Sequence, residues 1–330
     1  MELVDVLDEN GNKTGEKTTL DDICNRGLWH NSVHAIIITK DHKIIAQKRS
    51  LSIVMNPDMI ELSVGGAVNS AEEPLQAIIR ETKEELGIHV EPSEVIYINK
   101  RRYNKHYKKL NKTSKTILHT YVIKLRRPIS NTKLQDNETS KIYFLSESKA
   151  KRLVRYHRIA RLGKITPFYS YWKFSLDEAV KFIHPTIHFV CRGNIFRSRI
   201  AREYLAKHSE GINIISSGIM ADQKLFGNIS HHAKALMMKH GLVDHQKKWV
   251  QTTQHNIDSS TLVIFMSQTI LTDAKKMIDL TNIKYLVWDI PDIKHDSADA
   301  NIDQSEHIYQ MIITNIQDFK KSDLYQLISR

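Results

Sequence analysis

Cysteine is scarce in this sequence, and long hydrophobic runs are absent. The 330 residues include only two cysteines, Cys24 and Cys191, too few for a disulfide framework, which favours a reducing compartment such as the cytoplasm. The longest apolar runs, among them Ala35–Ile38 and Leu262–Met266, are far too short for a transmembrane helix. The first residues lack the basic and apolar segments of a signal peptide. We therefore expect a cytoplasmic protein with no membrane partner.

Neither disorder nor a fibrous repeat fits the composition. The hydrophobic share is 41% and the charged share 26%, which are ordinary values for globular proteins. At roughly 100–200 residues per domain, the length suggests two domains or one large one. Positive charge is in excess, with a net charge of +11 from 48 Lys and Arg against 37 Asp and Glu. Such an excess favours an anionic partner: nucleic acid, a phosphorylated small molecule or a membrane surface.

The excess charge is concentrated in the first half. Residues 1–184 hold 31 Lys and Arg against 22 Asp and Glu, whereas the remainder holds 17 against 15. Lys100–Arg127 has eleven basic residues and no acidic one, and Lys149–Lys164 is a second basic stretch. This difference supports a domain boundary, which we place at the linker Ile183–Thr186. The expected domains are residues 1–184 and 185–330.

Hydrophobic periodicity predicts an α/β fold in both halves. The first half reads as mixed α/β, and the second half, where strands and helices alternate, should form a doubly wound parallel sheet. The strands expected in the first half are Val33–Thr39, Lys43–Gln47, Glu94–Asn99 and Ile117–Lys124. One helix is expected after Pro74 and a second at Ser175–Ile183. In the second half the expected strands are Thr186–Val190, Ile212–Ile215, Thr261–Met266 and Ile283–Trp288, and the expected helices are Ser198–His208, Ser230–His240, Gln268–Leu280 and a last helix around Ile308–Phe319.

Three glutamates carry the first candidate chemistry. On the helix after Pro74, Glu81, Glu84 and Glu85 stand at positions i, i+3 and i+4 and therefore share one face. Because like charges repel, a hard divalent cation would compensate them, and carboxylate oxygens suit Mg²⁺ or Mn²⁺. Mg²⁺ is commonly bound by a few carboxylates together with substrate phosphates, which points to a diphosphate ligand. Arg80 and Glu72 could pair and fix the preceding loop to the helix.

The full pattern resembles the Nudix box, Gly-x5-Glu-x7-Arg-Glu-U-x-Glu-Glu-x-Gly-U, where U is a bulky apolar residue. It departs from the box only at Thr82, where U is usual. The resemblance covers roughly residues 1–184 and implies a Nudix α/β/α sandwich with a mixed sheet. Glu81, Glu84 and Glu85 would hold the metal ions, and Glu84 or Glu85 would orient the attacking water. The positions that would support the box are Gly66, Glu72, Arg80 and Gly87.

The segment before the box, Gly27–His34, resembles the isopentenyl-diphosphate-isomerase-like branch of the Nudix proteins. True isomerases use a cysteine downstream of this strand, and none lies between His34 and the end of the domain, so hydrolysis is the better interpretation. His30 and His34 could reach the site or be structural, and the structural role is favoured. We expect Cys24 to be a structural thiol.

A cysteine in a loop between a strand and a helix carries the second candidate chemistry. In Cys191-Arg-Gly-Asn-Ile-Phe-Arg197-Ser198, the backbone N–H groups and the helix dipole would favour an anion and a thiolate. Arg197 could grip phosphate oxygens with its guanidinium fork, and Ser198 could donate a hydrogen bond to the thiolate. The other residues expected to bind phosphate are Arg192, Gly193, Asn194, Ile195 and Phe196.

This loop resembles that of the low-molecular-weight protein tyrosine phosphatases. The likeness spans roughly residues 185–330 and includes Ser216-Ser217-Gly218. It implies a nucleophilic Cys191, a phosphocysteine intermediate, no cofactor, and a general acid near the C-terminus. Asp292 is the favoured acid and Asp289 the alternative. Arsenate reductases share the loop, but the thioredoxin-coupled type needs further cysteines, and the second half has only Cys191.

Three functions remain open. The first is a bifunctional phosphohydrolase: the Nudix half cleaves a nucleoside-diphosphate-linked compound, and the second half dephosphorylates a phosphomonoester, either a small molecule or a phosphotyrosine protein. The second is a signalling tyrosine phosphatase with a nucleotide-sensing Nudix module. The third is an RNA-directed Nudix enzyme, because tyrosines interleave with the basic residues of Lys100–Arg127. For that run we favour a solvated hairpin or a wall beside the diphosphate site over a nucleic-acid surface.

Overall fold

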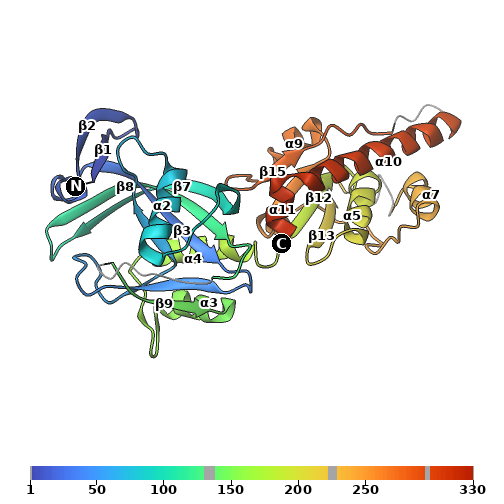
Figure 1. The fold of residues 1–330 in the computed structure, drawn as a ribbon. Helices are drawn as coiled ribbons and strands as arrows, with labels where there is room; N and C mark the ends of the chain where they lie inside the picture. The colour runs from blue at the N-terminus through green and yellow to red at the C-terminus, as the bar shows by residue number, and fades with distance from the viewer. Residues whose placement is uncertain (1, 130–137, 222–228, 294–297, 330) are drawn as a thin grey trace. The chain divides into compact units, whose positions relative to one another are not determined.

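Two compact units make up the chain, Met1–Ile183 and His184–Arg330. The structure is a computed structural model that describes residues 2–129, 138–221, 229–293 and 298–329. In those ranges no helix is both long and apolar enough to cross a membrane. Figure 1 shows the chain coloured from its N-terminus to its C-terminus.

The N-terminal unit is built on a mixed sheet. Nine strands form it, with the central path β2-β1-β3-β4-β5, and a separate small hairpin joins β10 to β11. The strands are β1 (Leu3–Leu7), β2 (Lys13–Thr19), β3 (Trp29–Ile38), β4 (Ile44–Arg49), β5 (Ile60–Glu61), β6 (Val64–Ala67), β7 (Val95–Tyr107), β8 (Lys112–Lys124), β9 (Thr139–Leu145), β10 (Arg158–Ile159) and β11 (Gly163–Lys164). The helices are α1 (Leu20–Arg26), α2 (Pro74–Leu86), α3 (Glu147–Tyr156) and α4 (Tyr169–Val180), with a short 3-10 helix at Pro92–Glu94.

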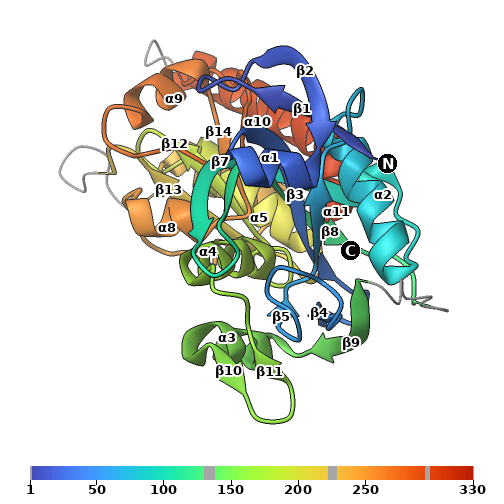
Figure 2. The same ribbon diagram turned by 90° about the vertical axis from the view of Figure 1, so that its left-hand side faces the viewer.

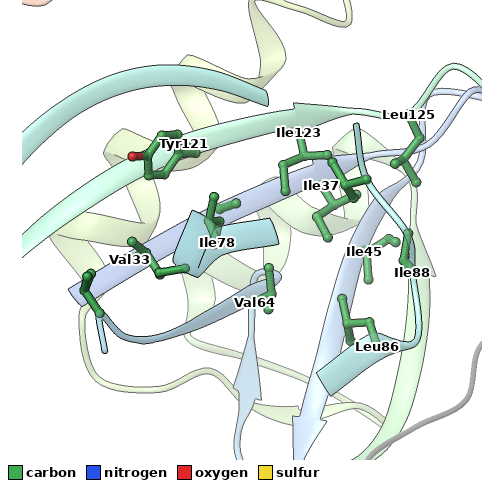
Figure 3. Close-up of a cluster of buried hydrophobic side chains, with 14 residues drawn as sticks. Val33, Ile37, Ile45, Val64, Ile78, Leu86, Ile88, Tyr121, Ile123 and Leu125 are labelled. Carbon is green, nitrogen blue, oxygen red and sulfur yellow. The ribbon is translucent and has the colours of Figure 1, made fainter. Parts of the chain in front are cut away.

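The side chains of strand β3 alternate in direction, so one face of the strand packs against α2 and the other against α4. Val33 and Ile37 belong to a buried cluster that also contains Ile78 and Leu86 of α2, and Figure 3 shows these side chains together. His34, which points the other way, contacts the aromatic rings of α4. Burying each large aliphatic side chain contributes roughly 1.5–3 kcal/mol. The sheet is therefore covered on both faces, as an α/β/α sandwich requires.

Helix α4 begins earlier than the sequence pattern predicts. It spans Tyr169–Val180 rather than Ser175–Ile183 and buries a stripe that includes Tyr171, Trp172, Leu176 and Ala179. The first turn was missed because aromatic residues are weak helix formers, and packing against the sheet decides the outcome. Figure 2 shows α4 near the hairpin of β7 and β8, and that hairpin extends β7 well beyond the expected end at Asn99.

The C-terminal unit has a parallel sheet of four strands in the order β13-β12-β14-β15. The strands are β12 (Thr186–Cys191), β13 (Asn213–Gly218), β14 (Leu262–Phe265) and β15 (Tyr285–Val287). The helices are α5 (Arg197–Lys207), α7 (His231–Lys239), α8 (Gln254–Asp258), α9 (Gln268–Ala274), α10 (Ala298–Lys321) and α11 (Asp323–Ser329). Helix α9 stops at Ala274, six residues before the predicted end.

Both faces of this sheet are covered as well. Val190 and Phe265 pack with Ile270 of α9, while Phe189 on the other face contacts Trp288, which in turn contacts Phe319 of α10. The unit is therefore doubly wound. Strand β12 pairs with β13 on one side and β14 on the other, so its carboxyl end is the point where the strand order reverses. Ligands of such sheets bind at that edge, and Cys191 is the last residue of β12.

Candidate active sites

Arg80 is the centre of the ion pairs on α2. Its guanidinium donates to both oxygens of Glu72 at 3.0 Å and to the carbonyl of Ala67 at 3.1 Å. It also donates to Glu81 at 2.9 Å and to Glu84 at 2.8 Å. The expected pairing of Arg80 with Glu72 is confirmed, and it ties the loop before the helix to its second turn.

Gly66 lets a carboxylate of α2 reach the sheet. A Cβ atom at this position would lie 2.1 Å from Oε1 of Glu81, so any side chain there would push the Glu81 carboxylate out of its place. Gly87 ends α2 in the left-handed conformation, which suits glycine. At the one departure from the box, the buried hydroxyl of Thr82 donates to the carbonyl of Ile78 at 2.6 Å. That hydrogen bond satisfies the polar group at a position where an apolar side chain is usual.

Glu85 is a buried carboxyl among other acids. It accepts a hydrogen bond from Gln47 Nε2 at 2.7 Å. Burial, together with the nearby charge of Glu81, raises the pKa of Glu85 well above its usual range. Burial likewise raises the pKa of Glu81 to about 7, against the opposing effect of Arg80. Glu138, which lies near both, has a pKa that burial also raises. These carboxyls resist carrying charge together unless a cation joins them.

The three glutamates of α2 are bound to different partners in this structure. Among the residues that the structure describes, no three His, Cys, Asp or Glu side chains gather closely enough to hold a metal ion. The reason is that Arg80 binds Glu81 and Glu84 while Gln47 binds Glu85. The donors nonetheless fit a divalent cation, because they are carboxylates on one helix face and burial opposes their uncompensated charge. Glu81, Glu84 and Glu85 stay the proposed ligands.

The basic run Lys100–Arg127 forms the hairpin of β7 and β8, as one of the sequence alternatives predicted. Two of the hairpin tyrosines are packed against other side chains and are not free to stack on bases. Tyr121 is buried in the core, and Tyr103 meets Tyr171 edge to face. Arg101 and Lys105 share the face of Tyr103 and also lie over rings, Arg101 over Phe174 and Lys105 over Phe168. This face is therefore a packed wall.

The second site is the loop that joins β12 to α5. The backbone N–H of Asn194 donates to Cys191 Sγ at 3.1 Å, and the Ser198 hydroxyl lies 3.0 Å from the same sulfur. The carbonyls of Cys191 and Arg192 accept from Ile219 N and Met220 N. Those carbonyls are thereby tied to the chain beyond β13. Gly193, Phe196, Arg197 and Ser198 are buried along the loop, while Arg192 and Ile195 are half-buried.

Asn194 holds the shape of this loop. Its backbone is left-handed, with φ of 56°, and its side-chain amide donates to Ser198 and to Ser216. Its carbonyl oxygen accepts from Gln246 and from Val250 N. On the adjacent strand, a Cβ atom at Gly218 would lie 2.6 Å from the carbonyl of Arg192. The likeness noted at Ser216-Ser217-Gly218 thus has a steric basis.

The two candidate acids differ in position. Arg197 is 5% exposed and donates to Asp292 at 2.6 Å and to the carbonyl of Ile290 at 2.8 Å. Asp292 itself is 58% exposed, so its carboxyl can reach both the loop and water. Asp289 is exposed and has no hydrogen bond to any described residue. The contact with Arg197 favours Asp292.

Several polar residues of these sites were not predicted. Gln47, Glu138 and Gln246 come from strands or loops far from the motifs, and their spacing gives no signal. Beneath the cysteine loop, the buried ring of His188 lies 2.7 Å from Ser217 Oγ, which contacts Thr252. Burial lowers the pKa of His188 to about 4. The only sequence signal for this network is that His188 interrupts an otherwise apolar strand.

Comparison with known proteins places a family in each unit. Residues 28–164 match the NUDIX domain, and residues 186–326 match the low molecular weight phosphotyrosine protein phosphatase family. An uncharacterised Nudix hydrolase of Clostridium acetobutylicum is 29% identical over 140 residues, which is 42% of this chain and 66% of that protein. A Yersinia pestis Nudix hydrolase is 32% identical over 88 residues, or 27% of this chain and 48% of that one. The chain thus spans between about half and two thirds of these relatives.

Solved structures are similar to each unit. DR0079 of Deinococcus radiodurans is 17% identical, with a TM-score of 0.40, and the match covers 53% of this chain and 99% of that one. The tyrosine phosphatase Wzb of Escherichia coli K30 is 19% identical, with a TM-score of 0.36, over 41% and 99% of the two chains. Both matched families are hydrolases. The chain therefore contains a Nudix domain followed by a domain of the low molecular weight phosphotyrosine protein phosphatase family.

Proposed function

We propose that the C-terminal domain hydrolyses a phosphomonoester through a phosphocysteine. The Cys191 thiolate attacks phosphorus and forms an S–P bond, the ester P–O bond breaks, and Asp292 gives its proton to the leaving oxygen. Water then attacks the phosphocysteine, Asp292 accepts the proton, and phosphate leaves as the S–P bond breaks. The observation that carries this proposal is the contact of Cys191 Sγ with Asn194 N–H and the Ser198 hydroxyl.

The surrounding residues would bind the phosphoryl group. Arg197 is the first residue of α5 and would place its planar fork on two phosphate oxygens. The loop precedes the N-terminus of an eleven-residue helix, which favours an anion. Both cysteines are free thiols, and a reducing compartment such as the cytoplasm would keep Cys191 in the reactive form.

Nudix domains generally use divalent metal ions, and we propose that this one hydrolyses a nucleoside-diphosphate-linked compound. Glu81, Glu84 and Glu85 would hold Mg²⁺ or Mn²⁺. When bound, the cation would neutralise the diphosphate and stabilise the leaving oxygen. Glu84 or Glu85 would orient the attacking water. Arg80, through Glu72 and the Ala67 carbonyl, would keep the helix against its loop.

The two activities are chemically compatible in sequence. Hydrolysis of a diphosphate link leaves a phosphomonoester, which is the class of substrate that a cysteine phosphatase consumes. We propose such a relay, in which the products are an alcohol and inorganic phosphate. Phosphorylated small molecules or nucleotides are then the partners of both domains, and phosphotyrosine proteins are the alternative for the second.

A panel assay tests this function. Nucleotide sugars, dinucleotides and nucleoside triphosphates are incubated with Mg²⁺, and both the first product and free phosphate are measured. The wild type should release both. Glu85→Gln should abolish both, whereas Cys191→Ser should accumulate the phosphomonoester and release no phosphate.

Two results would contradict the proposal. Unchanged phosphate release by Cys191→Ser would rule out the proposal that the two domains act in sequence. Tight binding of these compounds without any hydrolysis would instead make the Nudix domain a nucleotide sensor attached to a phosphatase.

A further inference from the structure

The hairpin of β7 and β8 has a second face, on the other side of the sheet from the packed wall described above. Successive side chains of a strand point to opposite faces, and residues directly opposed across an antiparallel pair share a face. We call the face opposite the wall the outer face. Its members on the two strands include Tyr97, Lys100, Arg102, Lys115, Ile117 and His119.

The outer face continues onto strand β3. Trp29 of β3 pairs with Lys115 of β8, and the guanidinium of Arg102 on β7 lies 5.4 Å from the centre of the Trp29 ring. A little further along the same face, His119 Nε2 lies 3.2 Å from Oδ1 of Asn31. These contacts run from one strand to the next, so β3, β8 and β7 present one continuous surface.

The cations of the outer face are not neutralised by acids. Lys100 and Arg102 are exposed and Lys115 is half-buried, and none of the three forms a salt bridge with any acid in the described ranges. The hairpin itself supplies no acidic residue. Burial and the charge of Lys100 lower the pKa of His119, against an opposing effect of Glu73 at the start of α2. The outer face therefore carries uncompensated positive charge beside an uncharged imidazole.

Tyr97 is the exposed ring of this face. Its side chain is 43% exposed, although the ring lies 5.4 Å from that of Tyr121 and 6.4 Å from that of His119, centre to centre. Because these neighbours already hold the ring in place, a second ring that stacks on it costs little side-chain entropy. Tyr97 is thus a fixed aromatic surface next to free cations.

This combination limits the kind of partner that fits. Unpaired cations in a row along strands, with an exposed ring among them, suit a chain that repeats phosphates and carries flat bases, which is single-stranded nucleic acid. An acidic peptide would use the cations and leave Tyr97 without a role. In a duplex the base faces are stacked on one another and are not available to the tyrosine. A membrane surface calls for several exposed apolar side chains, whereas Ile117 at the middle of the face is buried.

We propose that the outer face binds single-stranded nucleic acid, with backbone phosphates on Lys100, Arg102 and Lys115 and a base stacked on Tyr97. The proposal goes beyond the proposed hydrolysis and does not depend on it, because none of these residues belongs to either candidate active site. It also gives a partner to the basic run Lys100–Arg127, whose charge the two phosphate chemistries leave without a role.

The salt dependence of binding tests the phosphate contacts. The full chain is titrated against labelled oligouridine and oligothymidine strands of about 20 nucleotides, in EDTA, and fluorescence anisotropy is followed from about 50 to about 200 mM salt. At least one strand should bind, with a slope of log affinity against log salt of about −2 or steeper, since each phosphate contact contributes about −0.7. Lys100→Gln, Arg102→Gln and Lys115→Gln should each make the slope shallower by about 0.7.

An abasic strand of the same length tests the stacking. Tyr97→Ala should weaken binding of the normal strand by about 5-fold or more at every salt concentration, the usual effect of losing one stacked base, and should leave the salt slope unchanged. Binding of the abasic strand should not respond to this variant. Tyr97→Phe keeps the ring and should bind as the wild type does. If Tyr97→Ala fails to fold by circular dichroism, Tyr97→Leu takes its place.

The second basic stretch supplies matched controls. Arg155 is exposed and its guanidinium lies 5.5 Å from the centre of the Tyr156 ring, and Tyr156 is 62% exposed. Arg155→Gln and Tyr156→Ala thus remove the same kinds of side chain from helix α3, outside the outer face. Both variants should bind nucleic acid with the affinity and the salt slope of the wild type.

Three results would overturn the proposal. The first is no binding of either strand at the lowest salt concentration. The second is a salt slope that stays the same in all three cation variants, or changes as much in Arg155→Gln. The third is polyglutamate that competes as well as nucleic acid does, together with an unaltered affinity in folded Tyr97→Ala, which would make the outer face a site for acidic peptides. Hydrolysis enters none of these measurements, because EDTA removes the metal.

Discussion

The guanidinium of Arg197 donates a 2.6 Å hydrogen bond to the carboxylate of Asp292. One of these residues is proposed to bind the phosphoryl group and the other to protonate the leaving group. Arg197 is buried and also held by the Ile290 carbonyl, whereas Asp292 is more than half exposed. Asp292 is therefore the partner with room in solvent, and we expect its carboxyl to turn from the guanidinium to a leaving oxygen while Arg197 binds phosphate.

Asp292→Asn should lower the phosphatase kcat by roughly 10²–10⁴-fold, the usual contribution of a general acid. The loss should grow with the pKa of the leaving phenol in a series of aryl phosphates, because a poor leaving group needs the proton most. The kcat for each ester is the measurement. Asp289→Asn is the control and should stay near the wild type, since Asp289 contacts no described polar group. The reverse ranking of the two variants would make Asp289 the acid.

Gly66→Ala should reduce Nudix hydrolysis strongly while sparing phosphatase activity. The added Cβ would lie 2.1 Å from Glu81 Oε1, so the carboxylate must move away from its place on the helix face. We expect at least a ~10-fold loss, since misplacement of about 1 Å can cost 100-fold. Phosphate release from an aryl phosphate by the same sample is the internal control. Full Nudix activity would show that the position of Glu81 is unimportant.

Mg²⁺ should raise the melting temperature of the Nudix unit in the wild type. A cation that binds only the folded state stabilises it by mass action, and here it also relieves the repulsion among buried carboxyls. Glu81→Gln and Glu85→Gln should each lose most of this shift, and EDTA should reverse it. Glu9→Gln changes an exposed acid and should respond as the wild type does. A shift that survives in both site variants would place the ion elsewhere.

His188 should make the C-terminal unit less stable in acid. Its pKa is lowered by burial from 6.5 to about 4, so between these values the unfolded chain binds more protons than the folded one. Stability is then lost as the pH falls from about 6.5 to about 4. In His188→Asn, urea unfolding should show a weaker loss over this range, while exposed His255→Asn should match the wild type. An unchanged pH profile in His188→Asn would refute the assignment.

The elements near the motifs were predictable, and the elements between them were less so. The helix after Pro74 and the strand before Cys191 follow from capping residues and apolar runs. Strand β9 and helix α3 were not predicted, because a short edge strand and a strongly basic helix have little apolar signal. Helix α4 was placed six residues late, because its aromatic first turn is stabilised by the sheet and not by propensity.

Linear spacing by itself determined the chemistry of the two motifs. Helix periodicity places three glutamates on one helix face. The Cys-x5-Arg spacing places a cysteine and an arginine in the loop before a helix and at the first residue of that helix. Both patterns are local in the chain. The tertiary structure decided which partners these groups have. Gln47 meets Glu85, Asp292 meets Arg197, and His34 faces a cavity. Those contacts join segments tens of residues apart in the chain, and sheet pairing and burial set them, which no local pattern encodes.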